Sequence, residues 1–202
     1  MRFRVFAALE LPRYNQAQLG EVLAGLQTAV PPGTVRWVRP EVVHLTLKFY
    51  GDVPAEDVPA METALAEAAG QGQAMTLSLT GLGVFPNPRR PQVIWVGVAG
   101  DLDTLFTLQG RVEAVSEALG YAPEARAYKP HLTLGRVNGT LSPGEHVRLM
   151  EALQARRDDV FGAFQAETLS LVRSDLRPNG PVYTNLWAAA LGSPQGQTHQ
   201  NF

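Results

Sequence analysis

His44-Leu45-Thr46-Leu47-Lys48-Phe49 is the stretch that decides how this chain folds, because its first four residues occur twice. The second copy, His131-Leu132-Thr133-Leu134-Gly135-Arg136, follows 87 residues further along. Successive side chains of a β-strand point to opposite faces, so each copy presents its His and Thr on one face and its leucines on the other. Two such strands side by side predict a cleft lined by two imidazoles and two hydroxyls, above a core of leucines.

The repetition of His and Thr indicates function rather than packing alone. A lone half-buried His is more often a structural residue than a catalyst, but a structural repeat would need only the leucine pattern. His44 and His131 are also half of the four histidines in the chain. The other two, His146 and His199, are predicted to lie on a solvent-facing helix and in the C-terminal tail, and no function is assigned to them.

The composition is that of an ordinary globular protein, with 202 residues, 45% hydrophobic and 18% charged. This length suits one substantial domain or two small lobes that share a core. The absence of cysteine excludes disulfides, a thiol nucleophile and a thiolate metal site. A net charge of -2 argues against a protein that coats long nucleic acid. Arg makes up 15 of the 17 basic residues, which suits phosphate contacts, although the Ala, Gly and Pro content favours a compositional origin.

Several classes of protein are disfavoured by what the sequence lacks. Residues 1–5 do not resemble a signal peptide, and no apolar stretch approaches the ~20 residues of a membrane span, so we expect a cytoplasmic protein without a membrane partner. Gly81-Leu82-Gly83 lacks the rest of a nucleotide-binding fingerprint. Neither motif carries a third His or a carboxylate on its His face, whereas a catalytic zinc takes three protein ligands. We therefore expect neither a metal nor a cofactor.

Hydrophobic periodicity and breaker residues divide the chain into helices and strands. Besides the two motif strands, of which the first is predicted to stop at Gly51, the expected strands cover residues 3–9, 35–38, 75–79, 93–98, 164–172 and 182–190. The expected helices cover residues 13–29, 55–69, 102–119, with Leu119 facing inward, and 142–156, behind a capping box at Ser142–Glu145. Residues 81–91 are predicted to form a long loop, residues 173–180 a turn-rich link, and residues 193–202 a disordered tail.

Each half of the chain arranges its helices and strands in mixed order around one His motif. This order predicts two similar α+β lobes rather than a βαβ series. We expect both lobes to form a single domain over residues 1–192.

The paired His-x-Thr-x motifs resemble those of the two-histidine phosphoesterase superfamily, and their surroundings resemble its RNA 2',3'-cyclic phosphodiesterase group, historically called 2'-5' RNA ligases. The resemblance extends to residues 4–12, Trp37, Phe85-Pro86 and residues 128–131, and so covers nearly the whole chain. Lys48 stands where the family has no fixed residue. The resemblance implies a bilobal, pseudo-twofold α+β fold, with antiparallel sheets lining a central cleft and helices packed outside.

The chemistry of that family suits the residues of the two motifs. Opening a cyclic phosphodiester needs a base to accept a proton from water and an acid to protonate the departing ribose oxygen. Two imidazoles supply both near neutral pH, and Thr46 and Thr133 can donate hydrogen bonds to the non-bridging oxygens. The resemblance implies a 2'-phosphate product, and with it His44 as proton donor and His131 as proton acceptor, without a metal.

Arg136 is a further candidate phosphate ligand. Strict alternation along the strand puts its side chain opposite His131, so only a twist or bulge after Gly135 would bring it to the cleft.

Four other side chains are candidate contacts to RNA. Tyr128 and Phe49 can stack on a base, with core packing the favoured alternative for Phe49. Arg89 and Arg90 lie on the predicted loop and either follow an RNA backbone or are simply solvated.

We expect the substrates to be RNA ends or small cyclic nucleotides that carry a 2',3'-cyclic phosphate, and the protein to act as a monomer. Two other functions remain open. One is an RNA ligase that runs the same chemistry backwards, with a 5'-hydroxyl in place of water. The other is a catalytically idle module that binds RNA ends.

Overall fold

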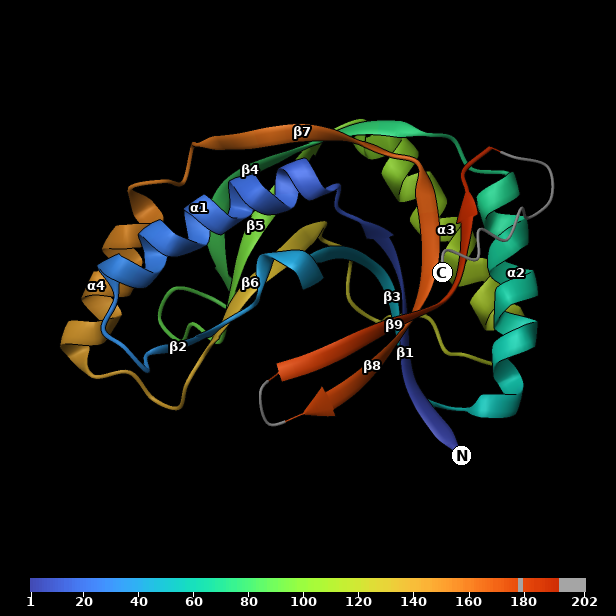
Figure 1. Cartoon of the computed structure of the whole chain (residues 1–202), viewed down its shortest axis with the longest axis horizontal. Helices are drawn as coiled ribbons and strands as arrows, with labels where there is room; N and C mark the ends of the chain where they lie inside the picture. The colour runs from blue at the N-terminus through green and yellow to red at the C-terminus, as the bar shows by residue number, and fades with distance from the viewer. Residues whose placement is uncertain (178–179, 193–202) are drawn as a thin grey trace.

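The chain folds into one curved antiparallel sheet with helices packed against it, seen in a computed structural model that describes residues 1–177 and 180–192 (Figure 1). The strands are β1 (Arg2–Glu10), β2 (Val35–Trp37), β3 (His44–Pro54), β4 (Met75–Phe85), β5 (Val93–Gly100), β6 (His131–Val137), β7 (Val160–Ala166), β8 (Thr168–Arg177) and β9 (Gly180–Ala190). The helices are α1 (Arg13–Ala29), α2 (Val58–Gly70), α3 (Leu102–Ala118) and α4 (Pro143–Gln154), with short 3-10 turns η1 (Pro40–Val42) and η2 (Ala55–Asp57). The predicted tail, residues 193–202, lies outside the described residues.

The order of the strands has a pseudo-twofold symmetry, which confirms the predicted bilobal arrangement. The sheet runs β7-β4-β5-β6-β3-β1-β8-β9, with β2 added beside β6. The motif strands β6 and β3 lie at its centre, so that β5, β4 and β7 follow on one side and β1, β8 and β9 on the other. β3 and β6 are joined where Leu45 pairs with Leu132. The pseudo-twofold axis therefore passes between the two motifs.

The two halves of the sheet exchange helices. α1 follows β1 but packs against β7 and α4, which belong to the other half. α3 follows β5 but packs against α2 and β3. Figure 1 shows the result, with α1 and α4 at one end of the molecule and α2 and α3 at the other. Each half is thus completed by a helix from the other half of the sequence.

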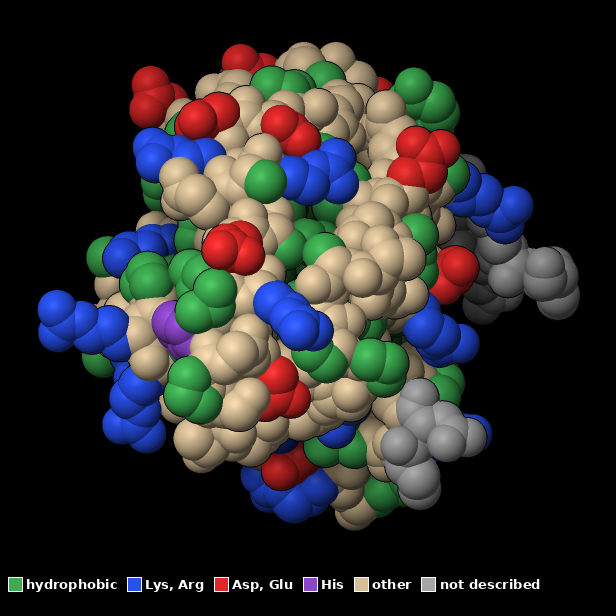
Figure 2. All heavy atoms as spheres, turned by 90° about the vertical axis from the view of Figure 1, so that its left-hand side faces the viewer, with side chains coloured by type: hydrophobic (Ala, Val, Ile, Leu, Met, Phe, Trp, Pro, Cys, Tyr) green, Lys and Arg blue, Asp and Glu red, His purple; other side chains and the backbone are tan. Residues whose placement is uncertain are grey.

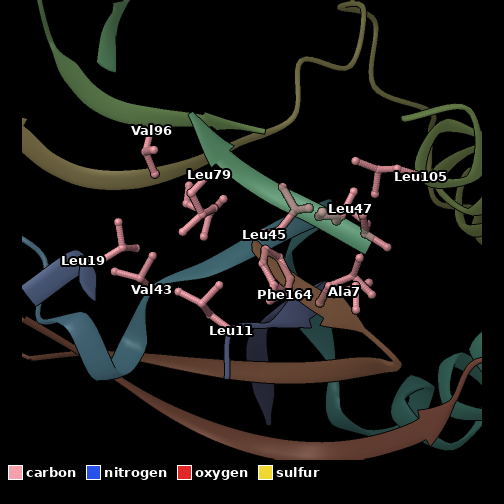
Figure 3. Packing of buried hydrophobic residues seen from close by; sticks show 14 of the residues in the cluster. Ala7, Leu11, Leu19, Val43, Leu45, Leu47, Leu79, Val96, Leu105 and Phe164 are labelled. Carbon is pink, nitrogen blue, oxygen red and sulfur yellow. The ribbon is translucent and has the colours of Figure 1, made fainter. Parts of the chain in front are cut away.

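The main hydrophobic core lies between the sheet and the helices (Figure 3). Alternate residues of the central strands enter it, and Leu19 of α1 and Leu105 of α3 cover them. Leu45 and Leu132 are almost fully buried here, and burial of such a side chain stabilises a fold by about 1.5–3 kcal/mol. The repeated leucines therefore fix which face of each motif strand is covered by helices. No helix in the described part of the chain is long and apolar enough to cross a membrane.

A β-bulge interrupts both motif strands at the same point. The pairing of β3 with β1 skips Leu47, and the pairing of β6 with β5 skips Leu134. One extra residue in a strand reverses the alternation of the side chains that follow. Lys48 consequently turns into the core, whereas Phe49 turns outward and is 50% exposed. The expectation that Phe49 packs in the core was wrong.

Glycines that look like breakers are bulges within continuous strands. β3 does not stop at Gly51 but passes through it, at φ 75°, as far as Pro54. β4 likewise continues through Gly81, at φ 62°, to Phe85, so the predicted loop over residues 81–91 was too long. Gly tolerates positive φ without a Cβ clash, which is why both strands can bend there without ending.

Three further expectations were wrong, two about the strands after residue 160 and one about the end of α3. The predicted strand over residues 164–172 is two strands, β7 and β8, separated at Glu167 where the chain leaves β4 and turns to pair with β1. The predicted link over residues 173–180 belongs largely to β8 and β9, apart from residues 178–179, which are not described. Leu119 is 40% exposed because α3 ends before it.

Lys48 is accommodated in the core by a buried ion pair. Its Nζ lies 2.5 Å from Glu113 Oε2 of α3 and also donates to the Ala122 carbonyl at 2.9 Å. The side chains of Lys48 and Glu113 are 4% and 17% exposed. The pair links the first motif strand to α3 and to the segment that leads to the second motif.

We expect Glu113→Ala to destabilise the protein by on the order of 3 kcal/mol in chemical denaturation, because it leaves the Lys48 ammonium buried without its counter-charge. The double variant Lys48→Met with Glu113→Leu should recover most of this loss, since it buries no charge. Glu117→Ala, an exposed change on the same helix, is the matched control. A loss below about 1 kcal/mol for Glu113→Ala would contradict the role of the pair.

Candidate active site

The two histidines begin the two central strands and face the same side of the sheet. Leu45 pairs with Leu132 in an antiparallel register, and paired residues share a face. Both leucines enter the core, so the flanking His and Thr of each motif lie on the opposite, concave face. Continued by one residue in each direction, this register sets each His beside the Thr of the other motif. The structure therefore brings together His44, Thr46, His131 and Thr133.

Both imidazoles are held in the same tautomer by the backbone. Nδ1 of His44 lies 2.9 Å from the Val42 carbonyl, and Nδ1 of His131 lies 2.7 Å from the Lys129 carbonyl. A carbonyl oxygen only accepts, so Nδ1 is the donor in each case. Nε2 then carries the lone pair of the neutral ring and the second proton of the charged ring. Each His presents to the cleft a nitrogen that can give or take a proton.

His44 lies in an aromatic environment. Phe6 stacks on its ring with centroids 4.4 Å apart, and Tyr183 meets it edge-on at 5.2 Å. Burial lowers the pKa of His44 from its ordinary value of 6.5, while the hydrogen bond to Val42 and the charge of Glu10 act in the opposite direction. The neutral imidazole is therefore favoured in the free protein.

The cross-strand neighbours of the two histidines differ. Glu10 pairs with His44, whereas Gly97 pairs with His131. The Glu10 carboxylate is fixed through Oε1, which accepts from Ser170 Oγ at 2.9 Å and from Asn185 Nδ2 at 2.7 Å. Sequence reasoning missed Glu10 as a site residue, because only the pairing of β1 with β3 brings it to His44.

The side of the cleft near His131 carries an aromatic pair. Phe85 meets the His131 ring edge-on at 4.9 Å and packs against Trp95 at 5.3 Å. The sequence indicates Phe85 only through the family resemblance. Its contact with the second His depends on β4 reaching this far.

The bulge in β6 brings Arg136 to the cleft face. The extra residue at Leu134 reverses the alternation, so Arg136 emerges on the side of His131 rather than opposite it. Burial raises the pKa of Tyr183, and the nearby positive charges of Arg136 and Arg4 oppose this rise. Arg4, which sequence reasoning missed, also lies over the exposed Phe49 ring, 4.5 Å from its centroid. Two guanidinium groups thus approach the cleft from different strands.

Tyr128 ties the segment before His131 to the first motif. Its hydroxyl donates to the Thr46 carbonyl at 3.0 Å, and its ring meets Phe106 edge-on. Burial raises the pKa of this hydroxyl, which stays protonated as a donor. Like the contact of Lys48 with the Ala122 carbonyl, this bond joins the first motif strand to the segment that leads to the second motif. Stacking of Tyr128 on a base stays a prediction, as does that of Phe49.

Arg89 and Arg90 lie in the exposed turn after β4, where their backbone N–H groups donate to Asn87 Oδ1. A contact with an RNA backbone stays a prediction for both. His146 of α4 donates from Nε2 to the Pro88 carbonyl at 2.7 Å and so holds this turn against the helix. His199 lies outside the described residues.

Two observations bear on nucleic-acid and metal binding, namely the distribution of charge at one end of the molecule and the grouping of possible metal ligands. Figure 2 shows basic and acidic side chains interspersed over the end of the molecule that includes α1 and α4. Within residues 1–177 and 180–192, no three His, Asp or Glu side chains are grouped so as to hold a metal ion.

The pseudo-twofold repeat is also detected by comparison with known proteins. The model of the family described as LigT like phosphoesterase matches residues 9–95 and then residues 96–183. The chain belongs to the LigT-like phosphoesterase family. The boundary between the two matches falls within β5, so each match contains one His motif.

Two relatives of this family member are similar to it over nearly their full length. A Methanothermobacter thermautotrophicus protein named RNA 2',3'-cyclic phosphodiesterase is 34% identical over 186 residues, 92% of this chain and 97% of the relative. A Thermus thermophilus protein of the same name is 34% identical over 205 residues, 96% and 93% of the two chains.

Solved structures agree with the fold. The Thermus thermophilus protein TT0787 superimposes with a TM-score of 0.76 at 28% identity, covering 95% of this chain and all of that one. E. coli LigT complexed with 3'-AMP gives a TM-score of 0.71 at 26% identity, covering 95% and 99%.

We expect the His44 ring to titrate below pH 6.5 when followed by NMR, because burial penalises its charged form. Phe6→Ala should move the midpoint up towards 6.5, since it removes the stacked ring. Tyr14→Ala removes an exposed ring on α1 and should leave the midpoint unchanged. A midpoint above 6.5 in the unaltered protein would show that Glu10, not burial, dominates.

Proposed function

We propose that this protein is an RNA 2',3'-cyclic phosphodiesterase that opens terminal cyclic phosphates by proton transfer between its two histidines. The observation that carries the proposal is the meeting of two His-x-Thr motifs on one concave face, where each His uses Nδ1 to bond to a backbone carbonyl and so keeps Nε2 for proton transfer. The names of the relatives point to the same activity.

The reaction needs one proton accepted and one proton donated. Water attacks phosphorus while Nε2 of neutral His131 takes its proton, and the bond from phosphorus to the ribose 3'-oxygen breaks. Nε2 of protonated His44 gives its proton to that oxygen, which leaves a 2'-phosphomonoester and a 3'-hydroxyl. Exchange with solvent then returns each His to its starting state. No step calls for a metal ion.

The side chains around the phosphate stabilise its developing charge. Thr46 and Thr133 share the cleft face with the histidines and donate hydroxyl hydrogen bonds to the non-bridging oxygens. Arg136, brought round by the bulge, adds a guanidinium to the same group. Hydrogen bonds that strengthen as charge accumulates lower the barrier rather than only tightening binding.

The unequal neighbours support His44 as the acid. Both rings have the same tautomer, so hydrogen bonding does not distinguish them. Burial lowers the pKa of His44 in the free protein, and the Glu10 carboxylate acts in the opposite direction. The negative phosphate of a bound substrate adds to the effect of Glu10 and so favours the protonated ring. His131 has a glycine in the corresponding place and carries Arg136 on its own strand.

We expect hydrolysis of an oligonucleotide with a 2',3'-cyclic phosphate end to survive exhaustive treatment with EDTA and to give a 2'-phosphate. The mapping of the product phosphate by selective phosphatase and NMR is the measurement. A preparation in which both His44 and His131 are Ala serves as the control for contaminating nuclease. Activity that is lost in EDTA and restored by zinc or manganese would refute the mechanism, and ligated product in excess of hydrolysed product would favour the ligase.

We expect His44→Ala and His131→Ala each to lower the rate by about a hundredfold or more. An aryl phosphodiester whose leaving group needs no proton separates the roles. On that substrate His44→Ala should recover much of its rate and His131→Ala should not. The reverse pattern would exchange the two roles, and full activity of either variant on the cyclic phosphate would refute paired-histidine catalysis.

A further inference from the structure

A pocket of about 240 Å³ opens on the concave face beside His44. Its lining comes from β1, the start of α1, the turn before β3, β8 and the edge strand β9. Besides His44 and Tyr183, the polar residues of the lining are Glu10, Gln16, Glu41 and Asn185. Because His44 is itself part of the wall, whatever occupies this pocket lies next to the proposed proton donor.

The pseudo-twofold repeat explains why the cleft is hollow on this side. Ala8 pairs with Thr46 of the first motif, and Trp95 occupies the matching position opposite Thr133 of the second. The indole of Trp95 packs so closely on Gly83 that a Cβ added there would lie 2.2 Å from the ring. A bulky residue therefore fills the region beside His131 where the methyl group of Ala8 leaves room beside His44. The cleft accepts an organic group on one side of the phosphate and not equally on the other.

The pocket wall combines aromatic surface with hydrogen-bond acceptors. Phe6 and Tyr183 supply the aromatic part. Within the described residues, Glu10 uses Oε1 to accept from Ser170 and Asn185, and Gln16 uses Nε2 to donate to the Leu11 carbonyl. These bonds leave Glu10 Oε2 and the side-chain oxygen of Gln16 to accept from a ligand. The exposed carboxylate of Glu41 stands in the same lining.

We propose that this pocket holds the base of the terminal nucleoside and prefers guanine. The inference rests on the proposed function, since it places the ribose and its base on the leaving-group side of the phosphate, next to His44. Guanine presents two adjacent donors, N1–H and the N2 amino group, which match carboxylate and amide oxygens. Adenine and cytosine offer one amino group, and uracil offers a single N3–H between two carbonyl oxygens that face the acceptors. Recognition by stacking together with the Watson–Crick edge is the usual way in which proteins read an unpaired RNA base.

The occupied pocket also orients the reaction. With the nucleoside beside His44, the 3'-oxygen departs towards that residue. Water must then approach phosphorus from the side of His131. The asymmetry between Ala8 and Trp95 thus leads to the same assignment of acid and base as the neighbours of the two histidines.

The test uses four short oligonucleotides of one sequence that differ only in the terminal nucleoside, each ending in a 2',3'-cyclic phosphate. We expect kcat/KM to be highest for guanosine and lowest for uridine, by at least about fivefold, as a good paired contact to a base provides. Glu41→Gln should reduce this ratio by about fivefold, because one acceptor becomes partly a donor. Glu21→Gln, the same change at an exposed position of α1 outside the pocket lining, should keep the ratio.

The outcomes separate this proposal from the proposed function. Hydrolysis of all four substrates at equal rates would overturn the guanine pocket and leave the phosphodiesterase standing. A guanosine preference that Glu41→Gln leaves intact would also overturn it, because the carboxylate would then play no part. If none of the four is hydrolysed, the proposed function itself fails. Ala8→Leu gives a second check, since a larger side chain in the pocket should raise KM for guanosine ends more than for uridine ends.

Discussion

The contact between Leu45 and Leu132 is the constraint on which the rest of this structure depends. It joins the two halves of the nine-stranded sheet, and both leucines are buried under helices. Because side chains alternate along a strand, burying these two residues forces both histidines onto the open face. The exchange of α1 and α3 between the halves reinforces the contact, since neither half has its own complete helical cover. Packing energy thus holds the geometry of the candidate site.

The bulges in β3 and β6 change which side chains of the two motif strands reach the cleft. A regular strand would leave Arg136 on the helix side and Lys48 in the cleft. One extra residue in each motif reverses both, so a guanidinium reaches the phosphate side and an ammonium enters the core. The buried Lys48 then requires Glu113, and this ion pair helps to hold the segment before His131. The same kind of bulge therefore brings Arg136 to the cleft in one half and buries the charge of Lys48 in the other.

Departures from the twofold symmetry give the cleft its direction. The two motifs have the same backbone hydrogen bonds, so they are chemically alike by themselves. Their neighbours differ, with Glu10 and Ala8 on one side and Gly97 and Trp95 on the other. His44 has a carboxylate and a hollow beside it, which suits a leaving nucleoside. His131 has a glycine and a filled surface beside it, which suits water. A fold built from two similar halves can thus acquire two chemically different sides through a few substitutions.

The sequence by itself determined the repeat, the helices and the chemical character of the site. The motif pattern was sufficient to predict strands with His and Thr on one face, because alternation and leucine burial are local properties of the chain. The pattern was not sufficient to predict which face the side chains of Phe49, Arg136 and Lys48 lie on, since a bulge is visible only in the pairing of neighbouring strands. For the same reason the sequence predicts strand ends at Gly51 and Gly81, where the structure has bends within continuous strands. Glu10, Phe6 and Tyr183 reach His44 only through pairings between distant strands, and the pocket exists because Ala8 stands where the other half has Trp95. Tertiary structure decided these features because each depends on which residues meet across the sheet, and that information is not contained in any one segment.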